Sequence, residues 1–129
     1  MIEPVSADRF QALVADERIP VEHRALWALL WEGELRLDDL LSIDVRDVDF
    51  EAHTIRVEHP AKAEGVAVVP FGARAGSLLW LAVGDSDAGP AIHRAGRPVS
   101  REAAMRVAEA VGVSVHGFRL GGQSQRRAG

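Results

Sequence analysis

Four residues of this sequence are of types that could contact an oxyanion. Arg36 stands alone between two apolar stretches in WEGELRLDDLLSI, and Lys62 is the single lysine among 15 basic residues. His116 and Arg119 lie three positions apart, a spacing that makes side chains neighbours on a helix. A guanidinium group is planar and offers paired N–H donors to an anion. Each of the four could contribute to a binding or catalytic site if the fold brings them together.

Each candidate also has a plainer interpretation. An arginine at a helix joint is commonly a surface residue or a capping partner, and a lysine in a polar turn is most often only solvated. His116 and Arg119 could form a local pair with no further role. Four more arginines flank one loop and helix, where a solvated face and a track of phosphate contacts are both open interpretations: Arg94, Arg97, Arg101 and Arg106.

The sequence predicts neither a metal nor a cofactor. It contains no cysteine, which excludes disulfides, thiolate metal ligands and cysteine nucleophiles. Four histidines fit no metal-ligand spacing, and we interpret them as surface or turn residues: His23, His53, His59 and His93.

Charge divides the chain into two unlike halves. Residues 1–60 carry 14 acidic and 6 basic side chains, whereas residues 61–129 carry 5 acidic and 9 basic ones. The net charge of −4 therefore hides a basic second half. Only that half suits an anionic partner.

The chain has the size and composition of one globular domain. A chain of 129 residues buries about two thirds of the surface that it exposes when unfolded. No stretch approaches the ~20 apolar residues of a membrane span, and the N-terminus lacks the basic start and apolar stretch of a signal peptide. We therefore expect a cytoplasmic protein without membrane contact.

Hydrophobic periodicity predicts a mainly helical chain. The helix that begins after Pro20 is apolar nearly all round and ends at Gly33, so it should be central. Ser6 or Asp8 could cap the first helix, and Ser100 the last. Three tryptophans are expected in the core: Trp27, Trp31 and Trp80. The predicted helices cover residues 5–17, 21–33, 35–43, 73–83 and 100–112.

Alternating apolar residues in the middle of the chain predict a small sheet. Residues 45–50 are expected to be extended, residues 54–58 to form a strand with Ile55 and Val57 inward, and residues 66–71 to return beside it. Together with the flanking helices, this pattern predicts an α+β fold, mainly helical, with a three-stranded antiparallel sheet.

The last residues carry weaker signals. Residues 113–119 begin like another helix, but two adjacent glycines follow, each ~1 kcal/mol less favourable than alanine in a helix interior. We expect residues 120–129 to be a flexible tail of a single domain that spans residues 1–129.

Several short motifs, in order, resemble the conserved boxes of the tyrosine recombinases, the family of the phage integrases. RLDDLLSI at 36–43 resembles the family's G-x-R-x-S-E-L-L-x-L box, and DVDF and TIRV resemble D-I-D-F and T-I-x-V. Lys62 precedes VPF as a catalytic lysine precedes V-P-L in the family. GRPVS resembles G-R-P-L-S, and HGFR at 116–119 resembles H-x-L-R. The matches run from about residue 20 to residue 119.

This resemblance implies the catalytic-domain fold of the family and a role in DNA integration and site-specific recombination. In the family a tyrosine attacks a phosphodiester and forms a phosphotyrosyl link. Arg36 and Arg119 would clamp the phosphate, Lys62 would protonate the leaving oxygen, and His116 would assist proton transfer. The expected contacts with double-stranded DNA come from Arg36, Lys62, Arg97, Arg101 and Arg119.

The sequence departs from the family pattern where the covalent step should occur. It contains no tyrosine, and ten residues follow Arg119 where the family continues with buried helices that carry the nucleophile. We therefore expect a domain that is incomplete at its C-terminus and does not cut DNA by itself. The missing helices would leave an apolar face open to self-association or to a protein partner.

Three interpretations follow from these residues. The first is a recombinase-like domain that binds DNA without catalysing its cleavage. The second is a protein-interaction module or regulator that kept the fold, which the acidic first half favours. The third is one piece of a larger enzyme that another polypeptide completes.

Overall fold

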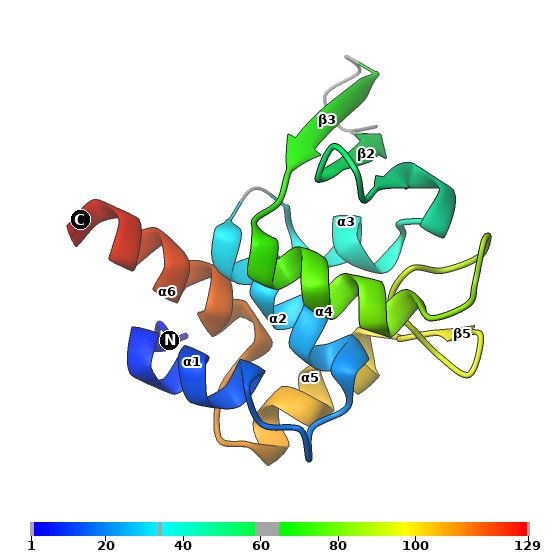
Figure 1. The fold of residues 1–129 in the computed structure, drawn as a ribbon. Helices are drawn as coiled ribbons and strands as arrows, with labels where there is room; N and C mark the ends of the chain where they lie inside the picture. The colour runs from blue at the N-terminus through cyan, green and yellow to red at the C-terminus, as the bar shows by residue number, and fades with distance from the viewer. Residues whose placement is uncertain (1, 34, 59–64, 129) are drawn as a thin grey trace.

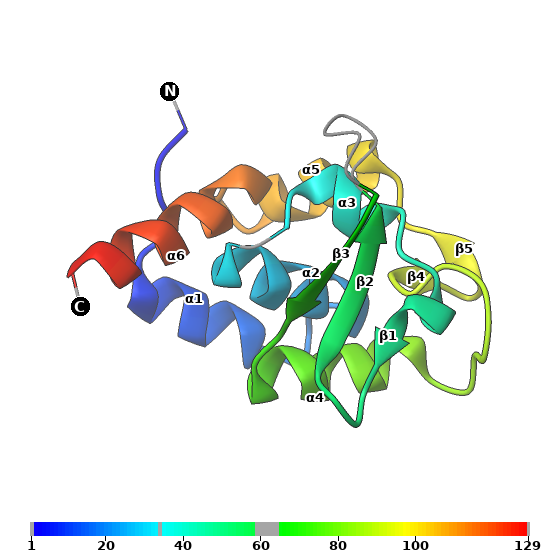
Figure 2. The same ribbon diagram turned by 90° about the horizontal axis from the view of Figure 1, so that it is seen from above.

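The computed structural model describes residues 2–33, 35–58 and 65–128, and it has one long helix at its centre (Figure 1). This helix, α2 (Val21–Glu32), is buried on nearly every side, as expected of a helix that is apolar all round. Gly33 ends it in the left-handed conformation, with φ of 80°, as the sequence predicts. Helix α4 (Ala73–Val83) packs on one side of α2 and helix α6 (Val115–Ala128) on another (Figure 2).

Two further helices begin directly after a capping serine. Helices α1 (Ala7–Val14) and α5 (Arg101–Ala110) each follow a serine whose hydroxyl accepts a backbone N–H of the first turn. These are the predicted caps Ser6 and Ser100.

Among the described residues, no helix is long and apolar enough to cross a membrane.

Stacked aromatic rings join three of the helices in the core. Phe10 of α1 stacks on Trp31 of α2 with ring centroids 4.2 Å apart. Trp27, also on α2, stacks on Phe118 of α6 at 4.8 Å. Trp27 is fully buried and Trp31 half buried, so the prediction of core tryptophans is confirmed for these two.

The sheet has three antiparallel strands in the order β1-β2-β3. They are β1 (Val48–Asp49), β2 (Thr54–Glu58) and β3 (Val66–Pro70), and β2 and β3 extend from the helical body in Figure 1. Ile55 and Val57 are buried, which confirms the predicted alternation. A second hairpin pairs β4 (His93–Arg94) with β5 (Arg97–Pro98). The predicted class, α+β and mainly helical, is confirmed.

The segment between the central helix and the sheet differs from prediction in part. Helix α3 (Leu37–Leu41) forms as expected, but residues 45–47, predicted to be extended, form the 3-10 helix η1 (Val45–Asp47). The reason is a local cap. The carboxylate of Asp44 accepts the backbone N–H of Arg46 and pairs with its guanidinium at 2.9 Å. These hydrogen bonds lower the pKa of Asp44 to about 2.

Helix α6 continues to Ala128, so residues 120–128 are helical in place of the predicted flexible tail. Its two adjacent glycines lie where the helix touches other backbone. A Cβ atom at Gly122 would fall on the backbone of Trp31, and one at Gly121 would fall on the carbonyl of Val5. Because glycine permits this close approach, tertiary packing offsets its low helix propensity.

Trp80 is not in the core, contrary to prediction. Trp80 is 63% exposed, and the next residue, Leu81, is 64% exposed. The buried side chains of α4, such as Leu79, lie on the face that packs on α2. Every residue of LLWLAV is apolar, so the sequence of α4 does not mark which face turns inward.

His23 is buried rather than at the surface, which corrects its interpretation from sequence. It lies in the first turn of α2 beside Trp27 and is 5% exposed. Burial is the main cause that lowers the pKa of its imidazole. The Glu22 carboxylate raises this pKa by a smaller amount, and the Arg94 guanidinium lowers it slightly further.

We predict that Gly122→Ala lowers the free energy of unfolding by about 2 kcal/mol, because the added methyl group has no space against the Trp31 backbone. Helix propensity alone predicts the opposite sign, a gain of about 1 kcal/mol. Urea unfolding followed by circular dichroism measures the difference. The matched control, Ser124→Ala at an exposed position of the same helix, should change stability by less than about 0.5 kcal/mol. A Gly122→Ala protein as stable as the wild type would exclude this close packing.

We also predict that stability falls as the pH drops below about 6.5, in part through His23. The lowered pKa of the buried imidazole means that the unfolded chain binds a proton there before the folded chain does. This contribution is therefore complete above the unfolded pKa and is lost on acidification. His23→Leu should flatten the dependence of the unfolding free energy on pH between about 7 and 5. Equal slopes for the variant and the wild type would contradict this role.

Candidate functional site

Arg36 lies at the joint between α2 and α3, where it is the N-cap residue of α3. Its backbone N–H donates to the Asp39 carboxylate at 3.1 Å, and its guanidinium Nε donates to the same oxygen at 3.4 Å. The Asp39 residue is only 9% exposed, and these two hydrogen bonds satisfy its buried carboxylate. Asp39 thus holds the backbone N–H and the Nε of Arg36 in place. The Arg36 side chain as a whole remains 61% exposed.

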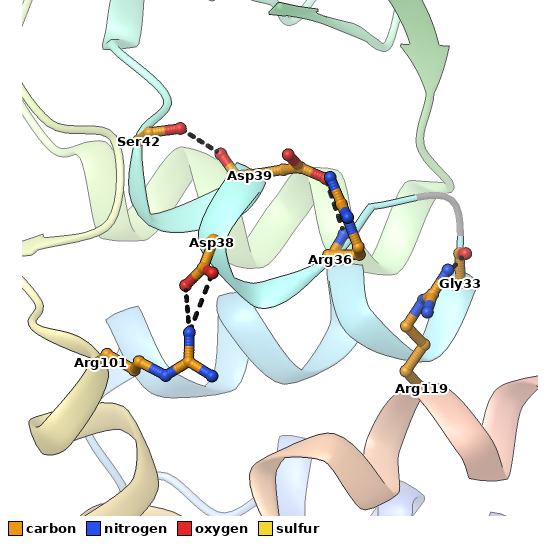
Figure 3. Close-up of polar contacts among 7 residues, drawn as sticks. All are labelled: Gly33, Arg36, Asp38, Asp39, Ser42, Arg101 and Arg119. Carbon is orange, nitrogen blue, oxygen red and sulfur yellow. Dashed lines mark hydrogen bonds and ion pairs between the residues drawn. The ribbon is translucent and has the colours of Figure 1, made fainter. Parts of the chain in front are cut away.

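Arg119 reaches the same joint from the other end of the chain. It is half buried on α6, next to Phe118, which packs into the core. Its Nε donates to the carbonyl oxygen of Gly33 at 3.4 Å (Figure 3). The last carbonyl groups of a helix carry partial negative charge, so the C-terminal end of α2 favours a cation at this place.

One pocket of about 430 Å³, here named the arginine pocket, brings these residues together. Arg36, His116 and Arg119 all line it, together with Arg101 from the start of α5. The rest of its lining is one acid and four apolar residues: Asp38, Ile2, Leu30, Leu37 and Leu120. The structure therefore places three of the four predicted catalytic residues in one pocket with a basic lining.

Arg101 is held in the pocket by an acid that sequence reasoning did not single out. Its Nη1 donates to both carboxylate oxygens of Asp38, at 2.8 and 2.9 Å (Figure 3). Both side chains are at least half exposed, so the pair is open to competition from another anion. One signal could have revealed it: Asp38 stands where the motif that the sequence resembles has a serine.

A second hollow, of about 530 Å³, continues from Arg36 along the sheet. It includes Arg56 of β2, a residue that was not among the predicted contacts, and reaches Glu58 at the end of that strand. Lys62 lies outside the described residues, so its position relative to the pocket stays a prediction. Arg97 is exposed on β5 and lines neither hollow.

The arrangement can bind and orient an oxyanion. Guanidinium groups form charge-assisted hydrogen bonds with phosphate or carboxylate oxygens, and the His116 imidazole can exchange a proton or a hydrogen bond with such a group. Within residues 2–33, 35–58 and 65–128, no group of three or more His, Asp or Glu side chains is placed to hold a metal ion.

No family model matches the sequence, and no curated protein does either. Solved structures do match. XerA recombinase matches over 100% of this chain and 50% of its own, with a TM-score of 0.76 and 17% identity. The integrase of transposon Tn1549, in complex with a circular intermediate DNA, matches over 98% of this chain and 54% of its own, with a TM-score of 0.70 and 14% identity.

The integrase from mycobacterium phage Brujita matches over 96% of this chain and 44% of its own, with a TM-score of 0.68 and 20% identity. This chain therefore spans about half the length of the recombinases that it matches. At these identities the likeness is one of fold.

Proposed function

We propose that this chain, which has the fold of the tyrosine recombinases and integrases, binds duplex DNA at the arginine pocket and does not cut DNA by itself. The observation that carries the proposal is the convergence of Arg36, His116 and Arg119 in one pocket from segments far apart in the sequence. The Tn1549 integrase with the same fold is in complex with DNA, which supports it.

In this proposal Arg36 and Arg119 contact the same stretch of phosphate backbone. Each guanidinium can offer paired donors to the non-bridging oxygens of a phosphate. Arg101 and Arg97 add contacts along the duplex, and Lys62 adds one from the segment between β2 and β3. His116, which also lines the pocket, hydrogen-bonds the phosphate.

The chain supplies no tyrosine for the covalent step of the family. In the proposal, Arg36, Lys62, His116 and Arg119 keep the positions of the catalytic residues, but a tyrosine nucleophile would have to come from outside these 129 residues. The interface for such a partner, or for a second copy, would include the exposed apolar residues at the rim of the pocket, Ile2 and Leu120.

The proposal predicts salt-dependent binding of duplex DNA that requires both arginines. Arg36→Ala and Arg119→Ala should each weaken binding by roughly tenfold or more and reduce the slope of log affinity against log salt concentration by about 1. Fluorescence anisotropy with a labelled duplex at low and moderate salt measures both quantities. Arg18→Ala removes an exposed arginine paired with Asp16 on the surface, and should bind like the wild type. Undetectable binding at low salt, or equal binding by all variants, would overturn the proposal.

A second prediction concerns the acid in the pocket. Asp38→Asn should strengthen DNA binding several-fold, because Arg101 is freed for phosphate and one repulsive charge is removed from the lining. Arg101→Ala should act in the opposite direction in the same titration. The control is Asp16→Asn, which removes an equal charge outside the pocket. An effect of Asp16→Asn equal to that of Asp38→Asn would assign the change to net charge alone.

A further inference from the structure

The outer face of α4 carries the largest exposed aromatic side chain described in the structure. Trp80 and Leu81, adjacent in sequence, each expose more than half of their area. The ring of Phe50 meets Trp80 edge to face, with centroids 5.0 Å apart and planes at 89°. An exposed tryptophan beside other apolar groups is unusual on a free surface and common at the centre of an interface.

Trp80 and Phe50 line a groove of about 520 Å³. Three small residues at helical spacing, Ala73, Gly76 and Ser77, come from α4. Gly76 is required there, because a Cβ atom would lie 2.9 Å from the ring of Phe71. Large aromatic side chains beside small residues leave room for an inserted side chain. The complete lining is Phe50, Glu51, His53, Ala73, Gly76, Ser77 and Trp80.

The acidic side chain that lines this groove gives it a negative charge. Glu51 is the only acidic or basic residue of the lining apart from His53. Asp85 and Asp87 are exposed in the loop that follows α4. Arg74, at the start of α4, lies over the ring of Phe10 at 5.6 Å and therefore turns toward α1.

We propose that this groove docks a basic amphipathic helix of a partner protein. An aliphatic or aromatic side chain of the partner enters the groove beside Trp80, over Gly76 and Ser77, and lysine or arginine side chains on its flanks approach Glu51. Apolar fit supplies most of the affinity, and the charges select a basic partner over an acidic one.

The exposed basic end of α6, QSQRRA, contains no large apolar side chain, so this end of a second copy would fit the groove poorly. The groove is also separate from the arginine pocket, since α2 lies between α4 and α6 (Figures 1 and 2). The domain can therefore hold DNA and this partner at the same time.

The test uses two labelled synthetic helices, one of leucine and lysine and one of leucine and glutamate with the same apolar pattern. Fluorescence anisotropy with the full chain should show saturable binding of the Leu/Lys helix and no binding of the Leu/Glu helix. Trp80→Ala should weaken it by about tenfold or more, and Glu51→Gln by a smaller factor. Met105→Ala, which removes an exposed apolar side chain from α5, is the matched control and should have no effect.

Equal binding of both helices, or equal binding by Trp80→Ala and the wild type, would overturn the proposal. So would a dimer of the chain alone, detected by sedimentation and abolished by Trp80→Ala, because a second copy would then occupy the groove. Trp80→Ala should bind duplex DNA like the wild type, which separates this proposal from the DNA-binding one.

Discussion

The close approach of α6 to the C-terminal end of α2 determines the geometry of the whole pocket. Gly121 and Gly122 bring the α6 backbone against Val5 and Trp31, at a distance that no residue with a Cβ atom could reach without a shift. That contact places Arg119 within hydrogen-bonding distance of Gly33, and Arg126 donates to the carbonyl of Trp31, two residues earlier, at 2.7 Å. A looser contact would carry Arg119 away from the joint where Arg36 lies.

The two arginines are oriented by different physical means. Arg119 depends on the end of a buried helix, whose unpaired carbonyl groups attract a cation whether or not an anion is present. Arg36 depends on a single buried carboxylate, Asp39, which fixes its backbone and Nε and leaves its terminal nitrogens at the surface. The pocket therefore holds one arginine that is half buried and one that can reorient toward a ligand.

The sequence predicts those parts of the fold that local patterns determine. The apolar helix ending at Gly33, the caps Ser6 and Ser100, and the alternation of Ile55 and Val57 are short-range features. It fails where a contact distant in sequence decides the outcome. The glycines of α6 have low helix propensity, and only their contacts with Val5 and Trp31 explain the helix. His23 is a polar residue type, and only the burial of α2 explains why it is inside the protein.

The candidate site shows the same division. The resemblance to recombinase motifs selected Arg36, His116 and Arg119, which the fold brings into one pocket. The motif marks Asp38 only as an acid in place of a serine, and it does not indicate that Asp38 pairs with Arg101. An ion pair between α3 and α5 depends on how two helices meet, and neither helix encodes that by itself. The sequence shows an acid at position 38, but it does not show that Arg101 is the partner of this acid.

The absence of tyrosine from the chain changes what a phosphate clamp can contribute. In a complete enzyme, guanidinium groups are useful because they bind the charge of the transition state more strongly than that of the bound substrate. Under the proposed function these 129 residues do not reach that transition state by themselves, and the same contacts contribute only to the affinity for the ground state. Under the proposed function, the arginine pocket is therefore a binding device, and an acid such as Asp38 weakens its affinity for DNA without affecting any chemical step.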